Sequence, residues 1–576
     1  MAAAKLQRRG TSGGLGGSGS GNVLPRLASR TASSASNGTG TSSAASSSSD
    51  LLRVGSRNIL DSPATPVDRK LARAASGSAA HGGGTPAASV AAAVSTTLRW
   101  ALGVVVTGAV LAWLLNGSYG WPSWLAWPGG GSGGAAGRAG AGFPTTPAGG
   151  RQPLAWLDWL GGVEDVPIVD WATLAAPAEE IVAAARPVRI VNSPAEDWPA
   201  RGKWTPEYVA GKLAGRKELA DVIVSRAPQI VYYDSNKPLK TLPGFPLRLP
   251  VHERRAVAVA TFFATIANAS DPTYMYWVGQ KQRRNLFRWM EADLAPTAPF
   301  WAGTPDGHTP NVQTWVGKSG LTSVVHYDAA HNFYVQLYGT KTFAIFTPAE
   351  APHFQICPFM HPGDGHSCLD WPTLEHAAAV GDRRLCPAGW ANVTARVVVL
   401  NAGDVLYLPP YWLHHVVTTG AGEAMSVSLI TESEPQALMR QVETYPLAFE
   451  IGWSRRKRVV AVVSLFHHLL TALGVRKTAG PAQLLAARYA GWMRSPEAAN
   501  AAKALVSDFR CSAPNPAIEA IVAQAGRDLA AVFGRLHNPG VLQLLLFNYL
   551  EAMAHWAVRE PALTPVFLRL MVQQCP

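Results

Sequence analysis

Two strand-like segments with polar residues at fixed places constrain this fold more than any other feature. Residues 321–347 read LTSVVHYDAAHNFYVQLYGTKTFAIFT, and residues 403–416 read GDVLYLPPYWLHHV. β-Branched and aromatic residues are frequent in both segments, as is typical of strands, and Pro409-Pro410 marks a strand end. The region 311–432 is strand-rich throughout, which predicts a mainly β domain in which distant strands converge in one jelly-roll barrel.

The first segment places a histidine and a carboxylate on one side of a strand. One residue separates His326 from Asp328, and side chains two positions apart on a strand share a face. A second histidine, His414 or His415, follows the second strand segment. Two histidines and one carboxylate form the facial triad of non-haem Fe(II) oxygenases, which leaves open positions for a cosubstrate and O₂.

These segments resemble the JmjC or cupin-like 2-oxoglutarate oxygenases, in particular the subgroup of the asparaginyl hydroxylase that modifies hypoxia-inducible factor. Two further stretches are similar to that family: RPVRIVNSPAEDWPARGKWTPEYV at 186–209 and HFQICPFMHPGDGHSCLDWP at 353–372. The resemblance covers roughly residues 160–435. It implies a double-stranded β-helix of the jelly-roll or cupin kind, with flanking helices.

The resemblance also assigns a ligand set for the metal. It implies that His326, Asp328 and His414 bind Fe(II), because the family ligand is the first histidine after an aromatic pair. Here Leu413 replaces the usual second aromatic residue. His415 is then expected to lie in the core or behind the metal ligands.

A cation for the distal carboxylate of 2-oxoglutarate is expected at Lys341, which follows His326 by 15 residues. A buried lysine is unfavourable without an anionic partner, and the cosubstrate supplies one. The alternative is a surface lysine at a strand edge. By the same resemblance, further polar cosubstrate positions are Ser323, Asn332, Tyr276 and Ser428. Tyr274 competes with Tyr276, and relatives often carry Asn near the position of Ser428.

The implied activity is oxidation of a protein or peptide substrate with Fe(II), 2-oxoglutarate and O₂. Hydroxylation of a protein side chain is the first expectation. A JmjC-type demethylase is one alternative, and a catalytically silent cupin-like binding module is another. The silent module would be favoured by the loss of any metal ligand, yet all three are present.

The part of the chain before residue 156 has a different character. Residues 1–97 are rich in Gly, Ser and Ala, which predicts a disordered tail. Residues 98–118 include the uncharged run WALGVVVTGAVLAWLL, flanked by tryptophans that suit a membrane interface. We predict one transmembrane helix there and a Gly/Pro-rich linker at 119–155. The oxygenase domain would then span 156–435.

The charge distribution argues against a nucleic-acid partner. The chain carries 50 basic and 38 acidic residues, but residues 1–99 hold 11 of the basic and only three of the acidic ones. Most of the positive charge therefore precedes the predicted span. By the positive-inside rule, the N-terminus is cytosolic and the catalytic domain lumenal, as in the ER or Golgi.

Two asparagines fit a lumenal domain, because Asn268-Ala-Ser and Asn392-Val-Thr are glycosylation sequons. A rival reading places the protein in an organellar membrane. Residues 1–49 contain five basic and no acidic residues, with abundant Ser and Ala, which also fits a transit peptide.

The remaining features leave alternatives open. Cys357, Cys368 and Cys386 lie among several histidines and could form a zinc site or one disulfide. From residue 436 to residue 576 the pattern is helical, and the resemblance suggests a homodimer through these helices. The basic cluster 455–458 is either a membrane-surface contact or a solvated helix start.

Overall fold

The computed structural model describes residues 154–574. Within that range it leaves out 217–218, 235, 240–251, 281–285, 302–310, 451, 476–484, 486–487, 490 and 507–514. The predicted tail, membrane span and most of the linker therefore lie outside the described residues.

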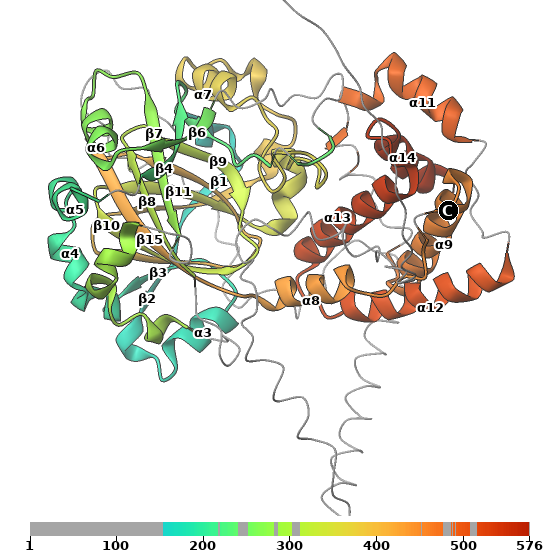
Figure 1. The fold of residues 1–576 in the computed structure, drawn as a ribbon, viewed down its shortest axis with the longest axis horizontal. Coiled ribbons are helices and arrows are strands. Elements are labelled where there is room, and N and C mark those ends of the chain that lie inside the picture. Colours follow the sequence, from blue (N-terminus) through green and yellow to red (C-terminus); the bar gives the residue numbers. More distant parts are fainter. Residues whose placement is uncertain are drawn as a thin grey trace, which may run out of the picture. The chain divides into compact units, whose positions relative to one another are not determined.

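Two facing sheets form the β part of the described protein (Figure 1). The smaller sheet has the order β1 (Gly162–Asp165), β12 (Thr394–Leu400), β11 (Lys341–Phe346), β14 (Leu413–Thr418), β9 (Thr322–Tyr327) and β5 (Gln229–Ile230). The larger has the order β2 (Ile168–Asp170), β3 (Val188–Val191), β13 (Val405–Leu408), β10 (His331–Tyr338), β15 (Glu423–Thr431), β8 (Asn311–Lys318), β7 (Tyr274–Gln280), β4 (Ala220–Ser225) and β6 (His252–Val257).

From β8 to β15 successive strands switch between the two sheets, except that β11 and β12 are neighbours in the smaller sheet, and the strands in this range pair with one another antiparallel. In the larger sheet β10 lies between β13 and β15, and in the smaller sheet β14 lies between β11 and β9. This is the topology of a double-stranded β-helix. The predicted mainly β fold with flanking helices is therefore confirmed.

Apolar side chains from both sheets fill the barrel, and helices cover the outside of the larger sheet. The barrel interior includes Phe343, Ile345, Leu400 and Leu406, all fully or almost fully buried. The covering helices are α3 (Pro177–Ala183), α4 (Pro199–Lys203), α5 (Pro206–Leu213) and α6 (Val259–Ala267). On the other side, α7 (Trp371–Ala379) packs beside a cluster of tryptophans against the smaller sheet.

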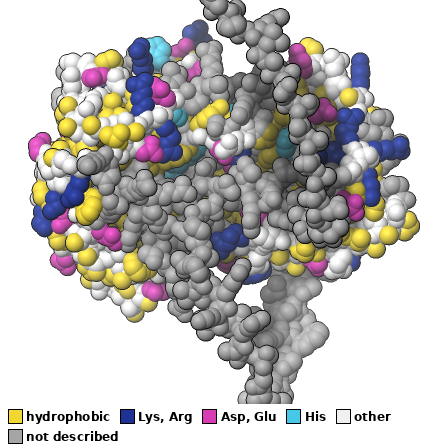
Figure 2. Space-filling view, viewed as in Figure 1, with side chains coloured by type: hydrophobic (Ala, Val, Ile, Leu, Met, Phe, Trp, Pro, Cys, Tyr) yellow, Lys and Arg dark blue, Asp and Glu magenta, His cyan; other side chains and the backbone are white. Residues whose placement is uncertain are grey.

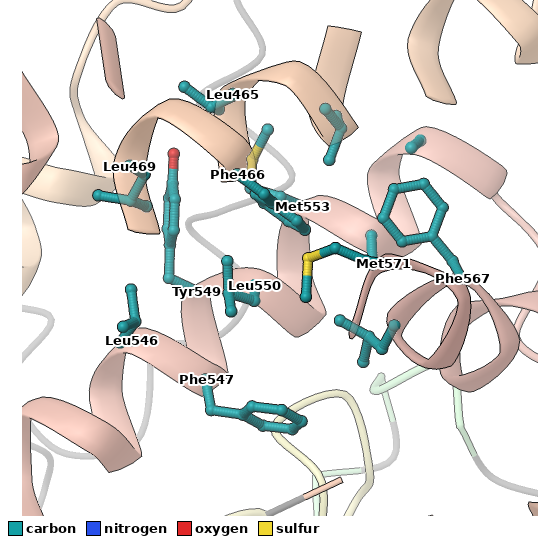
Figure 3. Packing of buried hydrophobic residues seen from close by; sticks show 14 of the residues in the cluster. Leu465, Phe466, Leu469, Leu546, Phe547, Tyr549, Leu550, Met553, Phe567 and Met571 are labelled. Carbon is teal, nitrogen blue, oxygen red and sulfur yellow. The ribbon is translucent and has the colours of Figure 1, made fainter. Parts of the chain in front are cut away.

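The C-terminal region is helical, as predicted, and has its own apolar core. It comprises α8 (Glu434–Glu443), α9 (Arg455–Ala472), α11 (Pro496–Val506), α12 (Pro516–Phe533), α13 (Pro539–Val558) and α14 (Leu563–Gln574). Figure 3 shows Phe466 of α9, Leu550 and Met553 of α13 and Phe567 of α14 meeting in this core.

Two helices of this region, α9 and α13, have features that could indicate contact with a membrane. The basic cluster 455–458 forms the first turn of α9, where Ser454 caps the helix and accepts from the amide of Lys457. Among the described residues, α13 alone is long and apolar enough to cross a membrane, but 83% of its apolar window is buried inside the protein. We therefore interpret α13 as a core helix.

Candidate metal and cosubstrate site

Three of the predicted ligands lie together where two barrel strands meet. His326 is near the end of β9, His414 is near the start of β14, and the two pair directly across the strands. Asp328 follows β9 by one residue. One donor atom from each of the three side chains lies within 4.8 Å of the others, and His414 Nε2 is 3.9 Å from Asp328 Oδ2.

The backbone orients both imidazoles. The Nδ1 of His326 lies 2.7 Å from the carbonyl oxygen of Val324, and that of His414 lies 3.0 Å from the carbonyl oxygen of Trp412. A carbonyl only accepts, so each Nδ1 carries the proton and each Nε2 keeps a free lone pair. Burial also lowers the pKa of His326 well below its usual value, which favours the neutral form that binds metals.

Asp328 is held both through its carboxylate and through its backbone carbonyl. The Asn332 amide, on β10, donates to Asp328 Oδ2 at 3.3 Å. The backbone carbonyl of Asp328 accepts from the amide of Tyr411 at 2.7 Å. The structure thus places Asn332 beside a metal-site carboxylate, and its Oδ1 is a buried acceptor without a hydrogen-bond partner.

His415 lies on the other side of β14, because neighbouring strand residues point to opposite faces. Its side chain is fully buried, with ring centroids 5.2 Å from Trp156 and 4.9 Å from Trp371. Its Nε2 is 3.7 Å from Glu375 Oε1. The structure therefore groups His414 with His326 and Asp328, and packs His415 among tryptophans.

Lys341 is a buried ammonium group inside the barrel, with 2% of its surface exposed. Its Nζ donates to the Tyr334 hydroxyl at 2.8 Å and to Ser426 Oγ at 3.1 Å. Burial lowers the pKa of Lys341 to about 7. The alternative of a surface lysine at a strand edge is therefore wrong.

The predicted hydroxyl groups divide into two sets. Tyr276 lies near Lys341, with its ring centroid 5.7 Å from the Nζ, and its hydroxyl hydrogen-bonds Ser323. The ring centroid of Tyr274 instead lies 5.0 Å from the Nζ of Lys318. Ser428 accepts from the Trp315 indole at 2.9 Å, so its hydroxyl is engaged with a neighbouring side chain.

Sequence reasoning missed three residues of this region. Tyr334 and Ser426 hydrogen-bond each other as well as Lys341. Alternation along β10 could have indicated Tyr334, which follows Asn332 by two positions and so shares its face. The third is His366, whose ring stacks on His326 at a centroid distance of 5.0 Å.

The cysteines form a disulfide between Cys357 and Cys368, and Cys386 is free. Donor atoms of Cys357, His361 and Cys368 lie close enough to hold a metal, but the disulfide engages both sulfurs. His361 Nδ1 also accepts from the Gly363 amide at 3.0 Å. Of the two alternatives from the sequence, the structure contains the disulfide.

The donor sets fit the cofactors that the sequence suggests. Two neutral imidazoles and a carboxylate on one side are the ligand set of non-haem Fe(II). The second centre, Lys341, is a buried cation whose hydrogen bonds go to two hydroxyls. An incoming carboxylate would supply the opposite charge that a buried ammonium needs.

Comparisons with known proteins agree with this geometry. Residues 174–431 match the cupin-like domain family. The chain is 27% identical to tRNA wybutosine-synthesizing protein 5 of Gallus gallus, over 40% of this chain and 66% of that protein. It is 25% identical to the human bifunctional peptidase and (3S)-lysyl hydroxylase JMJD7, over 39% of this chain and 72% of that protein.

A shorter match reaches Jumonji C domain-containing protein 5 of Drosophila melanogaster, at 29% identity over 18% of this chain and 24% of that protein. The chain thus spans from about a quarter to about three quarters of the length of these relatives. The matched region contains all three grouped ligands and Lys341. The chain therefore carries, in residues 174–431, a cupin-like domain of the JmjC type.

Proposed function

We propose that this protein is an Fe(II)- and 2-oxoglutarate-dependent oxygenase. The observation that carries the proposal is the presence of two complementary centres in one barrel. His326, Asp328 and His414 offer three metal donors from one side, and Lys341 offers a buried cation that donates hydrogen bonds to two hydroxyls. A silent binding module would have no need to retain both.

Separate groups of residues would bind the metal and the 2-oxo acid. The two imidazoles and the Asp328 carboxylate would hold the metal, with both Nδ1 protons anchored on carbonyls. Lys341 would pair with the distal carboxylate of the 2-oxo acid. The hydroxyls of Tyr276 and Ser323 would orient it, and the apolar barrel would exclude water. Bound Fe(II) supplies the oxidising chemistry from O₂ and the 2-oxo acid.

Hydroxylation of a protein side chain is the reaction we assign, ahead of demethylation. It is supported by the similarity to JMJD7, whose name describes a lysyl hydroxylase. Other relatives are named for tRNA modification. A peptide is preferred because residues 152–576 hold 37 basic and 35 acidic residues. Figure 2 shows both signs interspersed over the described part of one face, whereas nucleic-acid sites are strongly positive.

The decisive experiment is succinate release. Protein loaded anaerobically with Fe(II) and 2-oxoglutarate should release succinate on exposure to air, and His326→Ala should not. His376→Ala, which removes an exposed histidine of α7, is the matched control and should behave as wild type. Equal succinate release from wild type and His326→Ala would falsify the oxygenase proposal. Turnover with tRNA but not with a peptide library would reverse the substrate assignment.

We further propose that the catalytic domain is lumenal and anchored by residues 98–118. Both sequon asparagines, Asn268 and Asn392, are exposed, and the Cys357–Cys368 disulfide suits an oxidising compartment. The domain should resist protease in intact microsomes and be digested after detergent is added. Digestion without detergent would contradict this orientation. An organellar membrane, reached by a transit peptide, is the competing location.

The homodimer through the C-terminal helices also stays a proposal. Helix α13 is almost entirely buried within its own chain, so a dimer would have to use other helices. Among the described residues of this region, the large apolar side chains that are exposed are Val506, at the end of α11, and Ile521, on α12. Light scattering of the purified protein measures the oligomeric state directly.

A further inference from the structure

A loop outside the barrel strands holds the backbone on both sides of His326. The amide of Ser367 donates to the carbonyl of Val325 at 2.7 Å, and the amide of Tyr327 donates to the carbonyl of Gly365 at 3.1 Å. The two bonds flank His326, and His366 of the same loop stacks on its ring with the planes 5° apart. The loop from residue 357 to residue 368, called the clamp loop here, therefore pairs antiparallel alongside β9 at His326.

The clamp loop is anchored in turn by a carboxylate of the C-terminal helices. The amide of Phe359 donates to Glu551 Oε2 at 2.5 Å. Glu551 lies on α13 and is fully buried. Its other oxygen accepts from Arg488 at 2.8 Å, and the Arg488 side chain is 1% exposed. Burying such an ion pair costs desolvation energy that a simple packing contact would avoid.

The other two metal-binding segments also contact this helical region. Asn548, one turn before Glu551 on α13, donates to the hydroxyl of Tyr327 at 3.4 Å, and Tyr327 lies between His326 and Asp328. Tyr411, which precedes His414, belongs to the apolar core of the C-terminal helices. Its ring packs on Tyr327 at 5.3 Å. The C-terminal helical region thus reaches the segments that carry all three ligands.

We propose that Glu551, held in place by Arg488, is a positioning residue for the metal site and acts through the clamp loop. The C-terminal helices would then help to hold the metal ligands in position. The inference rests on the oxygenase function proposed above. It predicts that losing the Glu551–Phe359 hydrogen bond loosens the clamp loop and misorients His326, while the Lys341 pocket stays intact.

Two double variants isolate this hydrogen bond. Both Arg488→Met/Glu551→Gln and Arg488→Met/Glu551→Leu remove the buried charges, so neither leaves an unpaired ion. Only the glutamine keeps an oxygen that can accept from Phe359. We expect the leucine variant to bind Mn(II), followed by electron paramagnetic resonance, about tenfold more weakly than the glutamine variant. Amides of the clamp loop should also exchange hydrogen faster in the leucine variant.

The kinetic signature should distinguish positioning from general destabilisation. The leucine variant should lose kcat and couple succinate release poorly to product, while its KM for 2-oxoglutarate stays unchanged. Glu519→Gln is the control in the same helical region, because that carboxylate binds Ser464 and His468 within the helices. It should leave Mn(II) affinity and clamp-loop exchange as in wild type.

Equal Mn(II) affinity and equal clamp-loop exchange in the two double variants would overturn the positioning role alone. A wild-type protein that binds no Mn(II) would overturn the oxygenase proposal and the positioning role together. If the leucine variant does not fold, Asn548→Leu tests the second contact, at Tyr327, with the ion pair intact. It should also weaken Mn(II) binding, and wild-type affinity there would count against the inference.

Discussion

The Nζ of Lys341 lies 2.8 Å from the Tyr334 hydroxyl, and only 2% of the lysine is exposed. Two hydroxyls solvate this charge less well than bulk water does, so the ligand-free protein carries a cost at Lys341. The cost is removed when a carboxylate enters. Stability and cosubstrate affinity should therefore respond in opposite directions to changes at this residue.

The substitution Lys341→Met tests this opposition. Methionine fills a similar volume without a charge, so we expect the ligand-free protein to become more stable, by about 1–3 kcal/mol. Affinity for 2-oxoglutarate should fall at least about thirtyfold, because the carboxylate loses its ionic partner. Thermal unfolding with and without 2-oxoglutarate measures both effects. A variant that is destabilised, or that gains as much stability from 2-oxoglutarate as wild type, would refute this role.

The pH dependence of stability offers a second test. Burial lowers the pKa of Lys341 from 10.5 to about 7. Between these values the unfolded chain binds a proton that the folded protein does not, so folding stability rises with pH across this window. The slope is at most about 1.4 kcal/mol per pH unit, and the burial cost is fully present below pH 7. Urea unfolding of wild type and Lys341→Met from pH 7 to pH 9 should show this slope only in wild type.

Cosubstrate binding should show the reverse trend. A bound dianion needs the charged lysine, so the Kd for 2-oxoglutarate should increase as pH rises above about 7. Calorimetric titrations at pH 6.5, 7.5 and 8.5 measure it. A Kd that is constant over this range would mean that Lys341 is already charged, or is not the partner.

The adjacent histidines of β14 should behave differently when replaced. His414→Ala should abolish Mn(II) binding and change the stability of the metal-free protein little. His415→Ala should keep metal binding but lose about 2–4 kcal/mol of stability, because it leaves a cavity between Trp156 and Trp371. Metal titration together with urea unfolding separates the two. The opposite pattern would make His415 the ligand.

The Cys357–Cys368 disulfide should stabilise the protein appreciably. It joins residues 11 positions apart, and closing a loop of that size is worth about 2–4 kcal/mol. The double variant Cys357→Ser/Cys368→Ser should unfold at a correspondingly lower urea concentration and be insensitive to reductant. Cys386→Ser, which replaces a free thiol, serves as the control. An unchanged midpoint in the double variant would show that the disulfide does not form in solution.

Much of the barrel followed from local pattern, because strand alternation is a property of neighbouring residues. The pairing of His326 with Asp328 on one face needs only the two-residue period. The choice between His414 and His415 depends on which of the two side chains lies on the same face of the sheet as His326. That is set by register across 88 residues of chain, and only the family resemblance indicated it.

Contacts between distant segments were beyond the sequence for the same reason. Ser426 meets Lys341 from 85 positions away, and Glu551 meets Phe359 from 192 positions away. Neither pairing leaves a periodic trace in the sequence. The helical character of 436–576 was predictable from its apolar spacing, but the contact of that region with the metal-binding strand was not.

The Phe359–Glu551 hydrogen bond also has a consequence for biosynthesis. During translation, Phe359 leaves the ribosome 192 residues before Glu551. His326, Asp328 and His414 also leave it before α13 is complete. At typical elongation rates that interval lasts about 10–40 s. During that interval the clamp loop of the nascent barrel would lack its hydrogen bond to Glu551. With the positioning role proposed for Glu551, the distance along the chain would delay assembly of the metal site until α13 is made, and would limit oxidant formation on unfinished polypeptides.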